Sequence, residues 1–233
     1  MEFSLFKEKV RGSFELDLNS YKENQLKRRL DNLMVKQNVS TGNYDEFFNL
    51  IAADRRAYTE FLDTLTINVS EFFRDKQIFD TLENNIIPSL LDKRKKLKTW
   101  SAACSNGAEP YSIAIILNEL SPGRDHYILG SDIDNRVLRA ALEGCYHEDQ
   151  VVNVSRWRRA KYFTRRGDKY YIAPSIKKMV LFKRHDLLLS PFEHGFDLIA
   201  CRNVVIYFTR AAQERLYLKF HRALSPGGIL FIG

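Results

Sequence analysis

The chain has 233 residues, 45% hydrophobic and 28% charged, which is long enough for one large domain or for a small and a medium one. No apolar run approaches the roughly 18 residues of a membrane span, and the start MEFSLFKEKVRG lacks the order of a signal peptide, so we expect a cytosolic protein. Three cysteines, never paired as C-x-x-C, argue against disulfides and against zinc. No metal is expected.

The formal net charge of +7 is concentrated in residues 145–186, where eleven basic residues face four acidic ones. Such a cluster is either a solvated surface or a binding surface. If it binds, its partner is acidic, which leaves nucleic acid and an acidic protein surface as alternatives.

Residues 1–66 carry the apolar spacing of short helices. In the stretch SYKENQLKRRLDNLM, leucines recur at helical spacing, and Ser20 with Glu23 has the pattern of a capping box. Asn43 and Glu46 repeat that pattern before a second helix. We therefore predict a helical N-terminal domain, followed at 67–97 by a linker and a packing helix interrupted by Pro88.

From residue 98 onward strands and helices alternate, which predicts a doubly wound α/β sheet. The expected strands are 98–103, 127–133, 179–184, 196–202 and 228–233. The expected helices are 109–120, 135–144 and 209–224.

Ligands of such sheets bind beyond the carboxyl ends of the strands. The first strand is followed by CSNGAEP, which lacks both the G-x-G-x-x-G spacing and the Gly-Lys-Ser/Thr ending of phosphate loops. Asp132 ends the second strand, where an acidic side chain commonly binds ribose hydroxyls; the alternative role, a helix N-cap, suits Asp134 better. Together these features favour an adenosine cofactor without phosphates, S-adenosylmethionine first. Gly107 would allow close backbone approach, and Glu109 could accept hydrogen bonds from a ribose or an ammonium group.

Four ordered motifs, TINVSEFFRD, WSAACSNGAEPYSIA, GSDIDNRVL and FDLIACRNVVIYF with PGGILFIG, carry a resemblance to a known family. The chain resembles the CheR-type chemotaxis receptor glutamate O-methyltransferases over nearly its whole length. The resemblance implies an all-α domain at 1–66 and a Rossmann-like methyltransferase domain at 98–233, with a small antiparallel β subdomain inserted at about 160–184.

The resemblance also implies site residues. Cofactor-binding positions would be Asn68, Ser70, Arg74, Glu109, Asp132, Asp186, Leu187, Asn203 and Val204. Arg74 resembles the bidentate partner of the methionine carboxylate, a role that suits a planar guanidinium. Asp186 and Leu187 would lie near the adenine, Asn203 and Val204 near the methionine end. Tyr207 would lie close to the transferred methyl, which makes Arg74 and Tyr207 the catalytic candidates. Phe72 and Phe73 are expected in the core.

Transfer of a methyl group to a glutamate needs no general base, because a carboxyl with a pKa of about 4.3 is already ionised at neutral pH. Positioning should dominate, in a pocket where the attacking anion is partly dehydrated. Arg74 and Tyr207 are then orienting groups. A lone histidine at a strand end, such as His185, is interpreted as structural.

The expected partner is the acidic cytoplasmic helical bundle of methyl-accepting chemoreceptors, bound by the basic β subdomain and the helical domain. The enzyme would then be cytoplasmic and recruited to membrane receptor arrays, with no membrane insertion and no nucleic acid bound. Some members of the family hold a tethering peptide at the receptor C-terminus. Because the loop TRRGDKYY is short, we predict that such tethering is absent or weak.

The end of the chain departs from the pattern of the family, and two alternative functions remain. The chain ends at GGILFIG, whereas sheets of this class usually finish with a further hairpin, so we expect some C-terminal residues to be missing and activity to be less certain than cofactor binding. A nucleic-acid methyltransferase would share the fold and charge, but RNVVIY lacks the prolines of its usual motif. The other alternative is a signalling module that binds cofactor without turnover.

Overall fold

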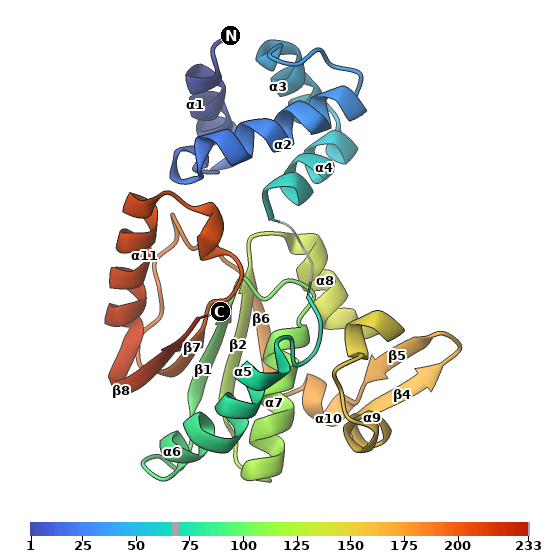
Figure 1. Cartoon of the computed structure of the whole chain (residues 1–233), viewed down its shortest axis with the longest axis vertical. Coiled ribbons are helices and arrows are strands. Elements are labelled where there is room, and N and C mark those ends of the chain that lie inside the picture. Colours follow the sequence, from blue (N-terminus) through green and yellow to red (C-terminus); the bar gives the residue numbers. More distant parts are fainter. Residues whose placement is uncertain (67–69, 233) are drawn as a thin grey trace. The chain divides into compact units, whose positions relative to one another are not determined.

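The computed structural model describes residues 1–66 and 70–232, which divide into two compact units (Figure 1). The first unit joins the N-terminal helices to Val204–Tyr217. Its elements are α1 (Phe3–Phe14), η1 (Leu18–Ser20), α2 (Glu23–Lys36), α3 (Tyr44–Ala53), α4 (Arg55–Thr66), η4 (Val205–Tyr207) and the first part of α11 (Arg210–Ala223).

An aromatic cluster forms the core of the first unit. Phe6, Phe47 and Phe61 are fully buried, and the ring of Phe6 lies 5.9 Å from that of Phe47 and 6.4 Å from that of Phe61. Such ring pairs contribute stability beyond that gained by burying their apolar area. The apolar residues that gave the helical pattern in the sequence therefore form a buried face in the structure.

The two predicted helix caps have different outcomes. The Asn43 side chain accepts a hydrogen bond from the backbone N–H of Glu46, so that cap is confirmed. The Ser20 cap is wrong: Ser20 lies in η1, its hydroxyl donates to Asp17, and α2 begins only at Glu23. Ser20 is held there by a tertiary contact, because its carbonyl accepts a hydrogen bond from the Thr209 N–H at 2.8 Å.

The second unit contains a five-stranded parallel sheet in the order β6-β2-β1-β7-β8. Its strands are β1 (Lys98–Ala102), β2 (Tyr127–Asp132), β6 (Val180–Arg184), β7 (Phe196–Ala200) and β8 (Leu224–Phe231). The predicted doubly wound fold is confirmed. β8 begins at Leu224, earlier than expected, because Leu224 already pairs with Phe196 before a register shift.

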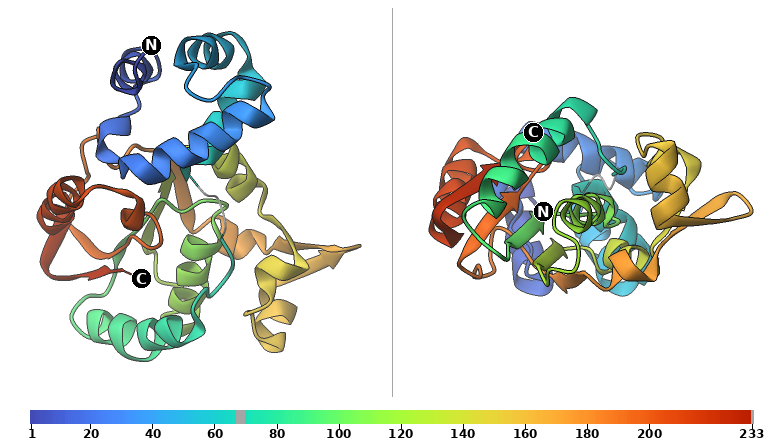
Figure 2. Two further views of the ribbon diagram at one scale, coloured as in Figure 1. Left: turned by 45° about the horizontal axis from the view of Figure 1, so that its top comes forward. Right: turned by 90° about the horizontal axis from the view of Figure 1, so that it is seen from below.

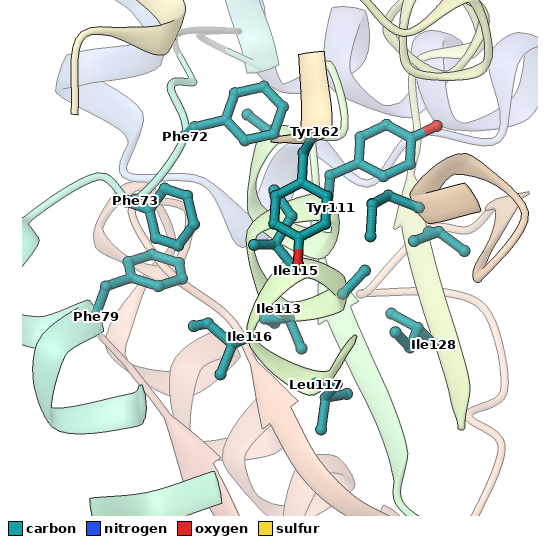
Figure 3. Close-up of a cluster of buried hydrophobic side chains, with 14 of the residues drawn as sticks. Phe72, Phe73, Phe79, Tyr111, Ile113, Ile115, Ile116, Leu117, Ile128 and Tyr162 are labelled. Atoms are coloured by element: carbon teal, nitrogen blue, oxygen red, sulfur yellow. The ribbon is translucent and has the colours of Figure 1, made fainter. Parts of the chain in front are cut away.

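Helix α7 (Ala108–Leu120) is buried over most of its surface, because it packs on the sheet on one side and on an aromatic cluster on the other. Phe72 and Phe73 belong to that cluster with Phe79, which confirms that the two phenylalanines lie in the core (Figure 3). The neighbouring elements are α5 (Lys76–Thr81), the π-helix η2 (Leu82–Ile86), α6 (Ile87–Leu91) and α8 (Asn135–Glu143).

A small antiparallel sheet, in the order β3-β5-β4, projects from this unit (Figure 2). It consists of β3 (Cys145–His147), β4 (Phe163–Arg166) and β5 (Lys169–Ile172), with η3 (Glu148–Val151), α9 (Arg156–Tyr162) and α10 (Pro174–Lys177) beside it. The hairpin with its Gly-Asp turn agrees with the sequence pattern. β3 is too short to give a sequence signal and was not predicted.

The strand order places a topological switch point between β1 and β7. From β1 the chain continues to β2 on one side of this point, and from β7 it continues to β8 on the other side. Open α/β sheets bind their ligands at such a point, beyond the carboxyl ends of the strands. A ligand-binding site is therefore expected at the segments that follow β1 and β7. Within the described residues, no helix has the length and apolar character needed to span a bilayer.

Candidate active site

The loop between β1 and α7 is shaped by Gly107. Its φ is +84°, and a Cβ built there would lie 2.8 Å from the Ala141 Cβ and 3.0 Å from the Phe182 ring. The glycine thus allows close approach, as expected, but the approaching groups are side chains of α8 and β6. Its role is to bring the first turn of α7 against these elements, which sets the position of Glu109 in that turn.

Asp132 is buried at the end of β2, with 5% of its surface exposed. Its two carboxylate oxygens accept hydrogen bonds from the backbone N–H groups of Ser105, at 2.9 Å, and Asp134, at 3.1 Å. Burial raises the pKa of Asp132, while these hydrogen bonds oppose the shift. The competing role, the cap of α8, belongs to Asp134, whose carboxylate accepts from the Arg136 N–H at 2.8 Å. Asp132 therefore ties the first loop to the second strand end.

Glu109 lies in the first turn of α7 with its carboxylate directed to the end of the sheet. One oxygen accepts a hydrogen bond from the Ser101 hydroxyl at 2.7 Å, and the other lies 3.6 Å from an Arg202 nitrogen. Burial raises the pKa of Glu109, opposed by Ser101 and by the positive charges of Arg202 and Arg74. An acidic acceptor thus lies beside the Arg202 guanidinium and also experiences the positive charge of Arg74.

Arg202, immediately after β7, is a central side chain of this site that the sequence analysis missed. Only 2% of its side chain is exposed. Besides Glu109 it contacts the Asp75 carboxylate and donates to the Arg74 carbonyl at 3.1 Å. The only available signal was its place after a strand end, next to Asn203.

Strained backbone gathers at the same place. Of seven non-glycine residues with positive φ within the described chain, five lie in the segments that meet here: Phe73, Asp75, Ala103, Ser105 and Asn203. Such conformations cost free energy and tend to cluster at functional sites. The strain supports the assignment of this region as the site.

The motif SEFFRD is brought to this site from the N-terminal side. The Ser70 carbonyl accepts a hydrogen bond from the Asn106 amide at 3.3 Å, which joins the motif to the first loop. Arg74 follows Phe73, and its charge acts on Glu109. Asn68, the remaining predicted residue of this motif, lies outside the described residues.

Asp186 and Leu187 follow β6. The Asp186 carboxylate accepts from the backbone N–H of Leu188 at 2.7 Å, so it shapes its own turn. Leu187 is 7% exposed, and its carbonyl accepts a hydrogen bond from Lys219 at 2.8 Å. This turn follows a strand two positions from β1 in the sheet.

The last predicted residues span the boundary between the two units. Asn203 is exposed, has a φ of 58° and ends one segment of the second unit. Val204 and Tyr207 belong to the first unit. There, the Tyr207 carbonyl accepts from the Lys22 N–H at 2.9 Å, and the Arg29 guanidinium lies 4.5 Å from the centre of the Tyr207 ring.

The histidines have structural contacts. His126 accepts from the Leu97 N–H at 3.0 Å and meets the Ser121 hydroxyl at 2.8 Å. His185 contacts the Pro191 carbonyl and packs edge-on against Trp100. Burial lowers the pKa of both imidazoles. No cluster of three or more potential metal ligands occurs among residues 1–66 and 70–232.

The residues at the switch point fit S-adenosylmethionine. Two acidic side chains, the buried Asp132 and the partly buried Glu109, supply the acceptors that ribose hydroxyls and an ammonium group need. The first loop contains no lysine to bind phosphates. Ser105 adds a buried hydroxyl that has no hydrogen-bond partner within the described part of the chain. Buried polar groups are normally hydrogen-bonded, so this one suits a ligand contact.

The parallel sheet and this set of hydrogen-bond acceptors define a protein of the S-adenosylmethionine-dependent methyltransferase class. Two family models match the chain: "CheR methyltransferase, SAM binding domain" over residues 68–233 and "CheR methyltransferase, all-alpha domain" over residues 1–66. The chain belongs to the CheR methyltransferase family.

Relatives support this assignment along the whole chain. A chemotaxis protein methyltransferase of Listeria innocua is 44% identical over 234 residues, covering 100% of this chain and 88% of the relative. One of Borreliella burgdorferi is 34% identical over 238 residues, covering 96% and 83%. The resemblance noted in the sequence is confirmed.

Solved structures with a similar fold are more distant. The glycopeptide N-methyltransferase MtfA complexed with S-adenosylmethionine is 14% identical, with a TM-score of 0.42 over 82% of this chain and 59% of that one. The PH0226 protein of Pyrococcus horikoshii is 20% identical, with a TM-score of 0.41 over 75% and 64%. Similarities at this level carry no argument about activity.

Proposed function

We propose that this methyltransferase transfers the methyl group of S-adenosylmethionine to glutamate side chains of chemotaxis receptors, forming methyl esters. The observation that carries the cofactor part is an acidic pair beyond two neighbouring strands: the partly buried Glu109 in the first turn of α7, after β1, and the buried Asp132 at the end of β2. The receptor part is supported by relatives named chemotaxis protein methyltransferases.

In this proposal each site residue contacts a particular part of the cofactor. Arg74 pairs with the methionine carboxylate, Glu109 receives the ammonium group and Asp132 the ribose hydroxyls. Asp186 and Leu187 border the adenine. The methionine end and the entry to the site are lined by Asn68, Ser70, Asn203 and Val204.

S-adenosylmethionine supplies an electrophilic methyl group on a sulfonium. The chain itself has to orient the attacking carboxylate, because a glutamate is already ionised at neutral pH and needs no base. Tyr207, close to the transferred methyl, and Arg74, at the methionine carboxylate, act as orienting groups. We expect water to be excluded around the reacting groups, which would leave the attacking oxygen less masked by solvent.

The basic residues of α9 and of strand β4 divide into two groups. Arg158 is paired with Glu83 and Glu119, each at 2.6 Å, and Arg159 is paired with Glu148, so these two are structural. Exposed basic side chains remain at Arg156, Lys161, Arg165 and Arg166, beside the exposed Trp157. This smaller surface is proposed to contact the acidic cytoplasmic helical bundle of a receptor in arrays at the membrane.

Tethering to a receptor C-terminal peptide is proposed to be absent or weak. The β4–β5 turn consists of Gly167 and Asp168 alone, which offers little extra surface. A tight complex between this chain and such a peptide in solution would contradict this.

The test has two stages. Calorimetric titration with S-adenosylmethionine and S-adenosylhomocysteine should show binding of both. A radiolabelled methyl assay on chemoreceptor membranes should then give label that base releases as volatile methanol, which is diagnostic of a carboxyl methyl ester. A nucleic acid offered in place of receptors is the control substrate and should acquire no label.

Binding without transfer to receptors would contradict the proposed substrate. The absence of binding to both ligands would overturn the proposed site as well.

A further inference from the structure

Arg202 occupies the switch point itself, because it follows β7 while Glu109 follows β1, the neighbouring strand. Its guanidinium contacts two segments that are distant from it in sequence, the first turn of α7 and the pair Arg74 and Asp75. It lies 3.6 Å from Glu109, donates to the Arg74 carbonyl at 3.1 Å and pairs with Asp75. Arg74 and Arg202 are 128 positions apart.

The surroundings of this guanidinium keep it in one place. Its carbon lies 5.5 Å from the centre of the Phe79 ring and 5.4 Å from that of Phe231. A planar cation between aromatic rings is favourable, and more so when water is excluded. Asp75, at the motif end, is 49% exposed, so Arg202 is the buried member of that pair.

We propose that Arg202 is a positioning residue: it holds the Glu109 carboxylate and the Arg74 backbone in the arrangement that receives the amino-acid end of S-adenosylmethionine. This inference rests on the proposed function for the identity of the ligand. Arg202 acts through Glu109 and Arg74, and no contact of its own with the methyl group is involved.

The charge on Glu109 provides a readout that a purely structural role would not affect. Five groups interact electrostatically with this carboxylate, and they come from three segments. They are Arg74, then Ser101 and the Cys104 thiol around the end of β1, and the Cys201 thiol with Arg202 after β7. Burial raises the pKa of both thiols, so they are neutral at neutral pH. The two arginines are therefore the cations that lower the pKa of Glu109 against the larger effect of burial.

The Arg202 charge affects the pH at which ligand affinity falls. Glu109 must be charged to receive an ammonium group, so ligand affinity falls as the pH drops through the pKa of Glu109. Removal of the Arg202 charge raises that pKa further, because the charge lowers it in the parent protein. The fall in affinity then begins at higher pH.

The experiment is calorimetric titration with S-adenosylhomocysteine from about pH 5 to about pH 9, a range that spans the titration of a raised carboxyl. The variants are Arg202→Met, Arg202→Lys, Glu109→Gln and the double variant Arg202→Met with Glu109→Gln. We expect Arg202→Met to weaken binding about tenfold near neutrality and to move the pH midpoint upward. Arg202→Lys should restore the midpoint and only part of the affinity, because an ammonium group lacks the planar fork.

In the Glu109→Gln background the Arg202→Met change should cost much less, because the group it acts through has been removed. Equal losses in both backgrounds, or an unchanged pH profile in Arg202→Met, would overturn the inference. If Arg202→Met does not fold, as judged by its melting curve, Arg202→Lys carries the test. Parental affinity in Arg202→Lys would then overturn the inference.

These outcomes are separate from those of the receptor assay. Arg202-dependent, pH-dependent binding together with failed transfer to receptors would overturn the proposed substrate and leave this inference supported. A parent protein that binds no S-adenosylhomocysteine would overturn both.

Discussion

Asp132 and Asp134 show how two residues of one type, two positions apart, acquire different roles. Both accept backbone hydrogen bonds and both are buried. Asp134 caps α8, a local task that any good capping side chain can perform. Asp132 accepts a hydrogen bond from the Ser105 N–H, 27 positions earlier in the chain. It therefore helps to fix the loop between β1 and α7.

We predict that Asp132→Asn weakens binding of S-adenosylhomocysteine by about 1 to 3 kcal/mol, because an amide replaces one of the two acceptor oxygens of a buried group. Isothermal titration at neutral pH measures the change. Asp134→Asn is the matched control and should bind like the parent, since asparagine is an equally good N-cap. Unchanged affinity in Asp132→Asn would assign that residue to loop structure alone.

At the scale of elements, the segment that contains Tyr207 belongs to the helical unit. An isolated antiparallel bridge joins Tyr21 to Phe208, and hydrogen bonds on either side connect the chain before α2 to the segment before α11. Arg29, on α2, lies over the Tyr207 ring. The helical unit therefore holds the proposed methyl-end tyrosine directly.

We expect Arg29→Met to lower the turnover of receptor methylation about two- to fivefold, the equivalent of losing a cation–π contact of roughly 0.5 to 1 kcal/mol. Cofactor affinity should stay near that of the parent. The control is Arg28→Met, which removes the same charge from an exposed neighbouring position of α2. If both variants lose turnover equally, the effect is one of charge and the contact with Tyr207 has no role.

At the scale of the whole molecule, the basic character of the chain is largely a surface property of one subdomain, reduced by internal pairing. Arg158 joins α9 to α7 and η2 through Glu119 and Glu83. The remaining exposed cations are free to act on a partner at a distance, and such attraction weakens with salt.

Receptor methylation at sub-saturating receptor is accordingly predicted to fall several-fold between low ionic strength and about 0.5 M salt, where the screening length is only a few ångströms. Titration with S-adenosylhomocysteine over the same range should change less, because the acidic groups proposed to bind it, Asp132 and Glu109, are at least partly shielded from solvent. A double variant, Arg165→Gln with Arg166→Gln, should have a flatter salt dependence of methylation. A parental salt slope in that variant would exclude the β4–β5 hairpin as a docking surface.

The sequence by itself determined the fold class, the strand ends that carry polar groups and the family, because strand and helix periodicity and the motifs after strands are local patterns. The helix at Asn43 and the cap at Asp134 are equally local and were predicted. The role of Ser20 was not, since its hydroxyl donates to Asp17 and its carbonyl accepts from Thr209, which is far away in the sequence.

Only the tertiary structure decided which strand ends are neighbours, and hence that Arg202 meets Glu109 and Arg74. It also decided that the Tyr207 segment joins the helical unit, and that part of the basic cluster is paired internally. Each of these depends on contacts between segments far apart in the chain, whose formation is governed by the packing of a common core and leaves no periodic trace in the sequence.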